Sequence, residues 1–323
     1  MSRHPSSRPS ELWPALAFLL PNFLGFMIFL TLPVLFSLVV SFSNYDLQGT
    51  VPFRWTGLEN FIELWHDPKF WSYFINTGYL MLGMPFAMGG SLLLAILLSQ
   101  KLRGLVAYRT FFYLPTFTAG IALMILWKKL YNPDIGPINV VLRALMDAVG
   151  IHGLAPPQWL LSTCNLFGLD VEHVGLTLKQ WGIGARDAII LMGIWTAVGG
   201  NNMLLYIAAL AGVPQDLYEA AEIDGAGRWA RFRHVTWPQL APTTFFIVVM
   251  SFIGGLQGGF EQARVMTGGG PAGTTKTLAY YIFEKAFKET QMGYASAVAW
   301  VLFLIIFGVT LLNWKFGSRE LND

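Results

Sequence analysis

The chain has 323 residues, of which 54% are hydrophobic and only 12% are charged, and its net charge at pH 7 is +2. Soluble domains carry about 25% charged residues, so much of the apolar surface of this chain must face something other than water. The near-neutral balance excludes a strong global attraction to nucleic acid or acidic substrates. The single cysteine, Cys164, excludes an intrachain disulfide and any multi-cysteine metal site.

Six long windows lack charged residues, and each is long enough to form a membrane-spanning helix. A helix needs about 20 mostly apolar residues to cross the hydrocarbon core of a bilayer. The sequence therefore predicts an all-α integral membrane protein with about six spans. We expect these near residues 13–41, 73–99, 109–128, 187–211, 242–260 and 294–315.

Short tails flank the membrane domain, which we expect to comprise residues 12–316. Residues 1–11 are polar and rich in Ser and Pro, which predicts a disordered tail, and residues 317–323 form the second tail. With six spans, both tails lie on the same side as the loops 100–109 and 212–241. These short segments are denser in Lys and Arg than the opposite side, so the positive-inside rule places both tails on the cytoplasmic side of the membrane.

Two segments are expected on the external side. The loop 46–71 contains a short amphipathic stretch from Leu58 to Trp65. Residues of about 143–186 form an insertion in the longest segment between spans. A surface helix is predicted just before and into it, from Ile138 to Val149, with an apolar stripe formed by Val141, Leu142, Leu145 and Val149.

The loop 212–242, between the fourth and fifth spans, carries signals for two short helices. Pro214 suits the first turn of a helix, and Asp216 and Glu219 lie near its positive end. Leu217, Ala220 and Ala221 share a face that is small and apolar.

A glycine is expected to separate the two helices of this loop. Gly225 suits the left-handed turn that ends the first helix. Apolar residues then recur at three-residue spacing as Trp229, Phe232 and Val235. Pro238 and Pro242 are expected to stop this second helix before the fifth span.

The same loop resembles the EAA loop of inner-membrane permeases of binding-protein-dependent ABC importers. The resemblance rests on Glu219-Ala220-Ala221, Asp224-Gly225-Ala226, Phe232 and Trp237-Pro238-x-Leu240-x-Pro242. In that family the loop is a cytoplasmic coupling helix that docks on an ATPase subunit. The resemblance thus implies coupling roles for Glu219, Ala220, Ala221, Asp224, Gly225, Ala226, Phe232 and Pro238.

Further motifs resemble the carbohydrate branch of that family, in the layout of the maltose-type first permease subunit. They are Trp55–Phe61, Asp67–Trp71, Arg103–Arg109 with Leu114-Pro115, Asn132–Gly136, Thr267–Pro271 and Met292–Ser296. The resemblance covers most of residues 12–315 and departs at about 143–186, where the family has a shorter connection. It implies four partners: a second homologous permease, a cytoplasmic ATPase dimer, an extracytoplasmic solute-binding protein and the lipid bilayer.

The chain carries no motif for ATP hydrolysis of its own. The nearest approach to a phosphate-binding GxxxxGK[ST] loop starts at Gly268, and it has Thr274 where lysine is required. The five histidines are scattered without metal-ligand spacing, and no catalytic constellation is visible. We therefore predict a transport subunit rather than an enzyme, with no cofactor and no metal, whose ATP is hydrolysed by a separate partner.

Polar residues inside the expected spans are candidates for the solute pathway. They are Trp195, Asn201, Asn202, Tyr206, Ser251 and Gln257. Helix packing is the competing interpretation, because small and amide side chains also bridge membrane helices. The sequence thus predicts half of a translocation pathway for a sugar or related polar solute, such as a polyol or a glycerol phosphate.

Two other functions stay open. A stand-alone secondary carrier would usually hold an ionisable residue inside a span, and the uncharged windows contain none. A membrane-embedded enzyme would need a polar constellation at the membrane edge, and none is apparent.

Overall fold

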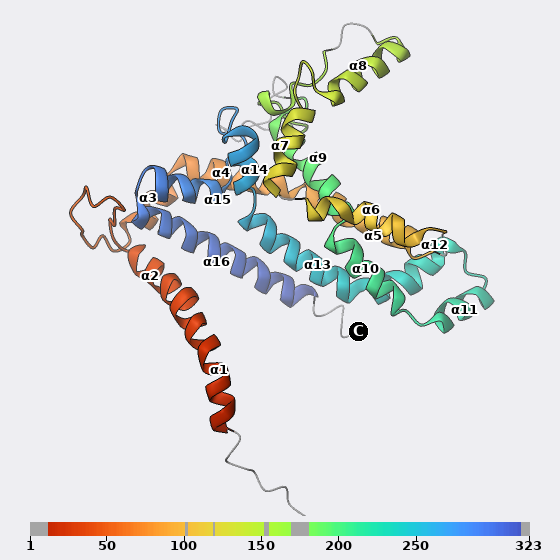
Figure 1. Ribbon diagram of the computed structural model, residues 1–323, viewed down its shortest axis with the longest axis horizontal. Helices are drawn as coiled ribbons and strands as arrows, with labels where there is room; N and C mark the ends of the chain where they lie inside the picture. The colour runs from red at the N-terminus through yellow and green to blue at the C-terminus, as the bar shows by residue number, and fades with distance from the viewer. Residues whose placement is uncertain (1–11, 101–102, 119, 152–154, 169–180, 318–323) are drawn as a thin grey trace, which may run out of the picture. The chain divides into compact units, whose positions relative to one another are not determined.

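The computed structural model describes residues 12–100, 103–118, 120–151, 155–168 and 181–317. These residues form helices joined by loops, with no β-strand among them, which confirms the all-α prediction (Figure 1). The predicted tail 1–11 lies outside the described residues, as do residues 318–323 of the second tail and residues 152–154 and 169–180 of the insertion.

Five helical segments are long and apolar enough to cross a membrane. They are Pro14–Val40, Pro68–Leu98, Ala185–Ala211, Arg228–Thr267 and Met292–Lys315. They coincide with five of the six expected spans. The remaining expected span, 109–128, corresponds to a bent pair of helices.

The chain divides into two compact units, residues 1–66 with 282–300 and residues 67–281 with 301–323. The first unit's second segment, residues 282–300, interrupts the second unit, which resumes within α16 at residue 301. The elements of the first unit are α1 (Leu12–Phe26), the π-helical turn η2 (Met27–Thr31), α2 (Leu32–Val40), α3 (Glu59–His66), the π-helical turn η7 (Glu284–Lys288) and the first part of α16 (Met292–Gly317).

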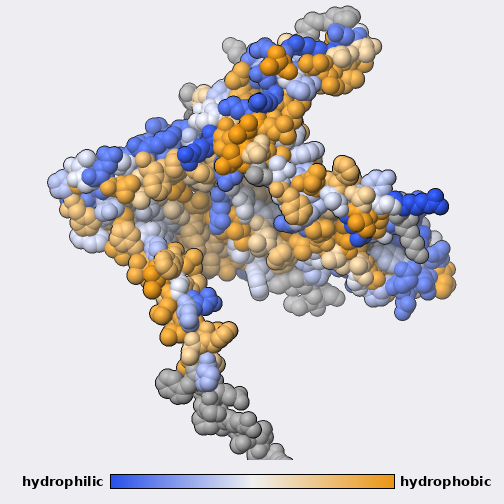
Figure 2. Space-filling model, viewed as in Figure 1, coloured by the Kyte–Doolittle hydropathy of each residue, from blue (hydrophilic) through white to orange (hydrophobic). Residues whose placement is uncertain are grey.

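The first span of this unit is one continuous hydrophobic helix from α1 through η2 to α2. It contains Pro21 and Pro33, whose missing N–H groups are tolerated in membrane helices because local π-helical adjustments satisfy the freed backbone groups. Such an adjustment precedes Pro33, where the Leu32 N–H donates to the carbonyl of Met27. The surface of α1 and α2 is largely hydrophobic (Figure 2), as a helix facing lipid requires.

A loop after the first span pairs with the turn that leads into α16. The Gly293 N–H donates to the Tyr45 carbonyl over 3.0 Å, and the Leu47 N–H donates to the Thr290 carbonyl over 3.0 Å. A Cβ at Gly293 would lie 2.0 Å from the Ser43 carbonyl oxygen. Only glycine therefore allows the two segments to approach this closely.

The second unit contains the remaining spans. Its elements are α4 (Pro68–Met81), α5 (Gly83–Leu98), α6 (Leu105–Phe117), α7 (Gly120–Leu130), α8 (Pro137–Val149), the 3-10 turn η3 (Trp159–Leu161), α9 (Ala185–Val198), α10 (Asn201–Ala211), α11 (Gln215–Ile223), α12 (Arg228–Arg231), the π-helical turn η5 (Phe232–Thr236), α13 (Trp237–Gln257), α14 (Phe260–Gln262), the π-helical turn η6 (Ala263–Thr267) and α15 (Leu278–Phe283).

Two apolar clusters hold these helices together. The first joins α5, α10 and α13 through Leu92, Ala95, Leu98, Met203, Tyr206, Leu240 and Ile247. The second joins α7, η3, α9 and η6 through Met124, Tyr131, Trp159, Ala188, Ile189, Met192 and Met266. The second cluster also secures the described part of the insertion, because Trp159 belongs to it and Leu160 and Ile183 pack against it, as do Ile138 and Leu142 of α8. Leu142 thus leaves the predicted stripe, while Val141, Leu145 and Val149 stay exposed.

The expected span 109–128 corresponds to α6 and α7, which meet at an angle of 94°. Thr118 ends α6 by adopting an extended conformation, with φ −70° and ψ 129°, and its N–H donates to the Pro115 carbonyl. Pro115 itself has no N–H and weakens the last turn of α6. An apolar window shows the length of a helix but not such a bend.

The second helix of the loop 212–242 does not stop at Pro238 or Pro242, as the sequence had suggested. It continues from α12 through η5 into α13, so the fifth span begins at Arg228. The π-helical turn explains the passage, because the Trp237 N–H donates to the Phe232 carbonyl immediately before Pro238. This wider π-helical turn lets the helix continue although Pro238 has no backbone N–H group to donate.

Candidate coupling loop and translocation residues

The predicted first helix of the loop is α11, and it ends where expected. Gly225 has φ +75°. The Ala226 N–H donates to the Ala221 carbonyl over 2.9 Å, and the Gly225 N–H donates to the Glu222 carbonyl over 3.0 Å. These two bonds form a Schellman motif, which requires a left-handed residue after the helix. The glycine at position 225 therefore sets the direction in which the chain leaves α11.

Side-chain contacts connect α11 to the second helix. The hydroxyl groups of Tyr218 and Thr236 are hydrogen bonded at 2.9 Å. Arg231 pairs with Glu222 at 3.3 Å, although Glu222 is exposed and such a pair contributes little in water. We call the segment from Gln215 to Thr236 the elbow. In Figure 1 its helices α11 and α12 lie at one end of α10 and α13.

The predicted coupling residues lie on or beside the surface of this elbow. Glu219, Ala220, Asp224, Gly225 and Pro238 are exposed, whereas Ala221, Ala226 and Phe232 are half-buried.

Phe232 has a supporting role within the elbow. Its ring stacks on that of Trp229 with centroids 5.5 Å apart and packs against the cluster of α5, α10 and α13. It thereby joins the elbow to the spans.

Sequence reasoning missed one prominent residue of this surface. Ile223, at the carboxyl end of α11, is 87% exposed, and Trp229 is 71% exposed. Large apolar side chains at such exposure on a small surface are typical of contact sites for another protein. Ile223 lies two residues before the glycine that ends α11. That position was the only feature of the sequence that could have indicated its exposure.

The fourth span is interrupted next to two of the candidate pathway residues. Gly199 and Gly200 separate α9 from α10, and a Cβ at Gly199 would lie 1.9 Å from the Phe112 carbonyl oxygen of α6. This close approach brings the Tyr113 hydroxyl to 2.8 Å from the Asn201 side-chain oxygen, to which it donates. Asn201 thus bridges two helices while remaining exposed, and Asn202 beside it is half-buried.

Tyr206 and Ser251 line the same cavity, a space of about 640 Å³ between α4, α5, α10 and α13. Its walls are mainly the methionine, leucine and phenylalanine side chains of those helices. Tyr206 is only 1% exposed and belongs to the first apolar cluster. Its position is therefore that of a core residue with a polar tip.

The two remaining candidates lie elsewhere in this unit. Trp195 is half exposed, and its ring contacts that of Trp127 with centroids 5.4 Å apart. Gln257 is exposed at the end of α13, where Gly258 is extended and Gly259 has φ +83°. The six candidates therefore do not converge on one cavity within the described residues.

A buried polar cluster, absent from the predicted windows, joins α4 to the start of α9. Arg186 and Asp187 are 1% and 2% exposed, and both lie in the first turn of the fourth span. The fourth span, Ala185–Ala211, thus begins with two charged residues that lie just before the uncharged window. The expected span began at residue 187, whereas α9 begins at Ala185 with Gly184 as its N-cap.

Each charge in this cluster has a partner. The Tyr79 hydroxyl donates to the Asp187 carboxylate over 2.6 Å, and the Arg186 guanidinium lies 4.6 Å from the centre of the Tyr79 ring. Arg186 also donates to the Asn76 side-chain oxygen over 3.3 Å. Buried charges are tolerated when they are paired and hydrogen bonded, so the cluster fixes the entry of the fourth span.

The same cluster extends to the glycine-rich segment before α15. The Asn76 amide donates to the carbonyl groups of Gly273 and Lys276 over 3.0 and 3.1 Å. The part of the chain that the structure describes contains no group of three or more His, Cys, Asp or Glu side chains able to hold a metal ion.

Residues 87–316 match the family described as the inner membrane component of binding-protein-dependent transport systems. Relatives in sequence include the probable ABC transporter permease YesP of Bacillus subtilis, which is 36% identical over 307 residues, covering 94% of this chain and 89% of the relative. The lactose transport permease LacF of Rhizobium radiobacter is 33% identical over 307 residues, covering 94% and 93%. The sn-glycerol-3-phosphate permease UgpA of Pectobacterium atrosepticum is 29% identical over 324 residues, covering 98% and 99%.

The fold is also found among solved structures. A chain of a bacterial ABC transporter involved in the import of the acidic polysaccharide alginate superimposes with a TM-score of 0.77. The two chains share 22% sequence identity, and the match covers 96% of each.

Proposed function

Because this chain belongs to the family of inner membrane components of binding-protein-dependent ABC importers, we propose that it forms half of a translocation pathway for a sugar or related polar solute. The sequence resemblance to the permease family is thereby confirmed, and a stand-alone secondary carrier is no longer required. Members of this family are transport subunits. The proposal extends to the partners: a homologous second permease completes the pathway, an extracytoplasmic protein delivers the solute, and a cytoplasmic ATPase dimer drives transport.

The choice of solute class is supported by the relatives. The names of two of them specify lactose and sn-glycerol-3-phosphate, and the chain with the matching fold belongs to an alginate importer. All three solutes are polyhydroxylated. Hydroxyl-rich solutes need amide and hydroxyl partners together with apolar ring faces, which Asn201, Tyr113 and Trp195 offer on exposed or half-buried positions of their spans.

The observation that carries the coupling proposal is the elbow. Its first helix, α11, lies between the fourth and fifth spans, its second helix is the start of the fifth span, and it exposes small and apolar side chains. A force applied to α11 reaches α13 through η5 and the hydrogen bond between Tyr218 and Thr236. In this proposal ATP binding draws the ATPases together, the elbows move with them, and the spans change the side to which the pathway opens.

Each coupling residue has a role consistent with its place. Ala220 and Ala221 let the ATPase approach the backbone of α11, and Glu219 and Asp224 offer exposed carboxylates for polar contacts. Gly225 and Ala226 make the turn, while Phe232 and Pro238 position the second helix. The elbow and both tails lie on the cytoplasmic side in this assignment, with the segment 143–186 outside.

A matched pair of glycine variants tests the coupling role. Gly225→Val forces a β-branched residue into a left-handed conformation, a strain of roughly 1–3 kcal/mol, although no atom lies within 4 Å of its Cβ position. Gly227→Val places the same side chain at φ −69°, ψ 171°, which valine adopts freely, and again no atom lies within 4 Å.

The variants are expressed with the second permease, the ATPase and the binding protein, and three quantities are measured. We expect Gly225→Val to insert normally, to retain less ATPase on purification and to lose solute uptake, whereas Gly227→Val behaves like the unaltered chain. Normal uptake with full ATPase retention in Gly225→Val would contradict the proposal. So would chemical labelling that places residues 216–236 on the external side.

A further inference from the structure

The helix α3, in the loop after the first span, has three distinct faces. Asn60 and Leu64 are buried on one face, and the charged residues Glu59 and Glu63 are exposed on another. The third face carries Leu58, Ile62 and Trp65, which follow one another at helical spacing. All three are exposed, by 61%, 58% and 64%. A water-facing helix would need polar residues on that third face.

The apolar face continues onto the loop before α3. Trp55 and Phe53 are both exposed, and their rings make an edge-on contact with centroids 5.2 Å apart. We call Phe53, Trp55, Leu58, Ile62 and Trp65 the aromatic face.

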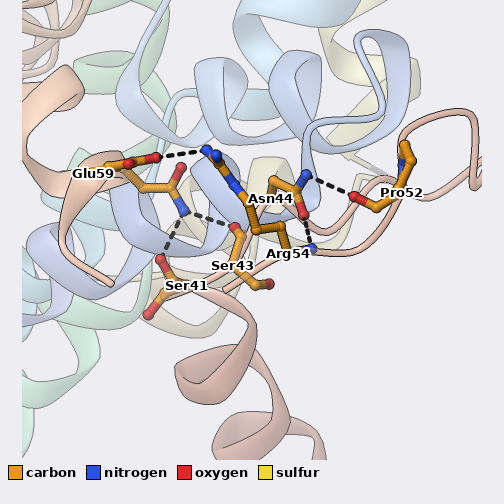
Figure 3. Close-up of polar contacts among 7 residues, drawn as sticks. Ser41, Ser43, Asn44, Pro52, Arg54 and Glu59 are labelled. Atoms are coloured by element: carbon orange, nitrogen blue, oxygen red, sulfur yellow. Dashed lines mark hydrogen bonds and ion pairs between the residues drawn. The ribbon is translucent and has the colours of Figure 1, made fainter. Parts of the chain in front are cut away.

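Hydrogen bonds hold the start of α3 against the end of the first span. The Asn60 amide donates to the carbonyl groups of Ser41 and Ser43, each over 2.8 Å (Figure 3). The Thr56 and Gly57 N–H groups both donate to the Phe42 carbonyl. Because Ser41 follows Val40 directly, the first turn of α3 lies within one side-chain length of the helix that crosses the membrane.

A second layer of polar contacts makes this arrangement rigid. The Asn44 side chain accepts the Arg54 N–H over 2.6 Å and donates to the Pro52 carbonyl over 2.9 Å (Figure 3). Arg54 also pairs with Glu59 at 3.2 Å, although both groups are exposed, so the pair contributes little. The loop therefore cannot swing the aromatic face away from the end of the span without breaking the bonds of Asn44 and Asn60.

We propose that the aromatic face lies in the headgroup region of the bilayer and anchors the external end of the first span in lipid. Tryptophan gathers at membrane interfaces, where its apolar ring can be buried next to water. Amphipathic helices lie in that region with one apolar and one charged face. Phe36 and Val39 of α2, near the end of the first span, are also exposed, so in this proposal the same bilayer covers both surfaces.

The anchor has a consequence for transport. The first span is the least buried of the candidate spans, with 6% of its most apolar window buried inside the chain. Packing within this chain therefore fixes the depth of the span weakly. A second attachment at the interface would hold it in place while the other spans move. The assignment to the external leaflet rests on the orientation proposed above.

Site-directed fluorescence tests the proposal in the assembled importer. Leu58→Cys and Ile62→Cys each introduce a thiol into the aromatic face in a Cys164→Ser background, where it is the only thiol of this chain. The partner subunits are used with their cysteines replaced, and Glu63→Cys is the matched control on the charged face. The proteins carry an environment-sensitive bimane label in phosphatidylethanolamine–phosphatidylglycerol vesicles. Quenching is measured with iodide and, separately, with lipids bearing a nitroxide near the headgroup end of the acyl chain.

We expect labels at positions 58 and 62 to show blue-shifted emission, quenching by the nitroxide lipids and loss of quenching by iodide. The label at position 63 should show the reverse. The proposal is overturned if iodide quenches all three labels equally. It is also overturned if positions 58 and 62 become shielded from iodide only when solute-binding protein is added, which would make the face a protein-docking surface.

A further outcome separates lipid from a neighbouring permease subunit. Shielding from iodide without quenching by nitroxide lipids would mean that protein covers the aromatic face, and the proposal would fail. None of these readouts depends on ATP hydrolysis, so the proposed coupling function and this inference can fail independently.

Discussion

The geometry of the break between α9 and α10 leads to a specific prediction about how α6 packs against the fourth span. Gly199 has φ −93° and ψ 5°, a conformation that alanine adopts, so Gly199→Ala introduces no backbone strain. Its Cβ would nevertheless lie 1.9 Å from the Phe112 carbonyl oxygen and 2.7 Å from the carbonyl carbon. Both obstructing atoms are main-chain atoms of α6, which cannot rotate away as a side chain can.

The size of the effect follows from this geometry. Real Cβ atoms essentially never approach within 3.0 Å of another heavy atom, so α6 must move outward by about 1 Å. Overpacking of this kind destabilises by about 1–3 kcal/mol, and we expect the upper end because the clash is with backbone. The same displacement lengthens the 2.8 Å hydrogen bond from Tyr113 to Asn201 and removes the bridge between two spans.

Gly193→Ala, in the same helix, is the matched control. Apart from the adjacent backbone of its own helix, no atom of the described residues lies within 4 Å of the Cβ position at Gly193, so the change should be neutral or stabilise by about 0.5–1 kcal/mol through reduced backbone entropy of the unfolded chain.

The assay combines the thermal unfolding midpoint of the purified importer with solute uptake in vesicles. We expect Gly199→Ala to lower both and Gly193→Ala to lower neither. An unchanged midpoint for Gly199→Ala, or an equal loss in the two variants, would refute the account of how α6 packs on the break.

Three further substitutions test individual polar contacts. Asn60→Asp keeps the size of the side chain but removes its two donated hydrogen bonds. We expect a lower unfolding midpoint and greater proteolysis of the loop after the first span. Unchanged proteolysis would argue that these hydrogen bonds do not hold α3 against the end of the first span. Tyr79→Phe leaves the buried Asp187 carboxylate without the hydroxyl donor and should destabilise the importer by about 1–3 kcal/mol, which a melting curve measures, and an unaltered curve would contradict it. Thr236→Val removes the partner of the Tyr218 hydroxyl within the elbow, so ATP hydrolysis should become less dependent on solute while membrane insertion stays normal; fully coupled hydrolysis would contradict that role.

Several features of this protein could be predicted from short stretches of its sequence. Five spans lie where the uncharged windows predicted them, because the length of a membrane helix is set by the bilayer and not by contacts with the rest of the chain. The end of α11 was equally local. Gly225 was predicted to adopt a left-handed turn, and its φ of +75° follows from the absence of a Cβ.

Other features depended on residues far apart in the sequence. Hydropathy could not show that Arg186 and Asp187 lie inside the fourth span, because their burial is tolerated only through Tyr79 and Asn76, more than a hundred residues earlier in the chain. Tyr206 resembled a pathway residue by its position in a span, yet packing against α5 and α13 makes it part of the core.

The sequence by itself determined the membrane-spanning class, the approximate spans and the helix α11 with the glycine that ends it. Hydrophobic length and backbone conformation are properties of short segments, so they can be read one segment at a time. Only the tertiary structure decided the bend between α6 and α7, the passage of the elbow into α13 and the attachment of α3 to the end of α2. These depend on hydrogen-bond partners and close approaches between segments, which no single stretch of sequence contains.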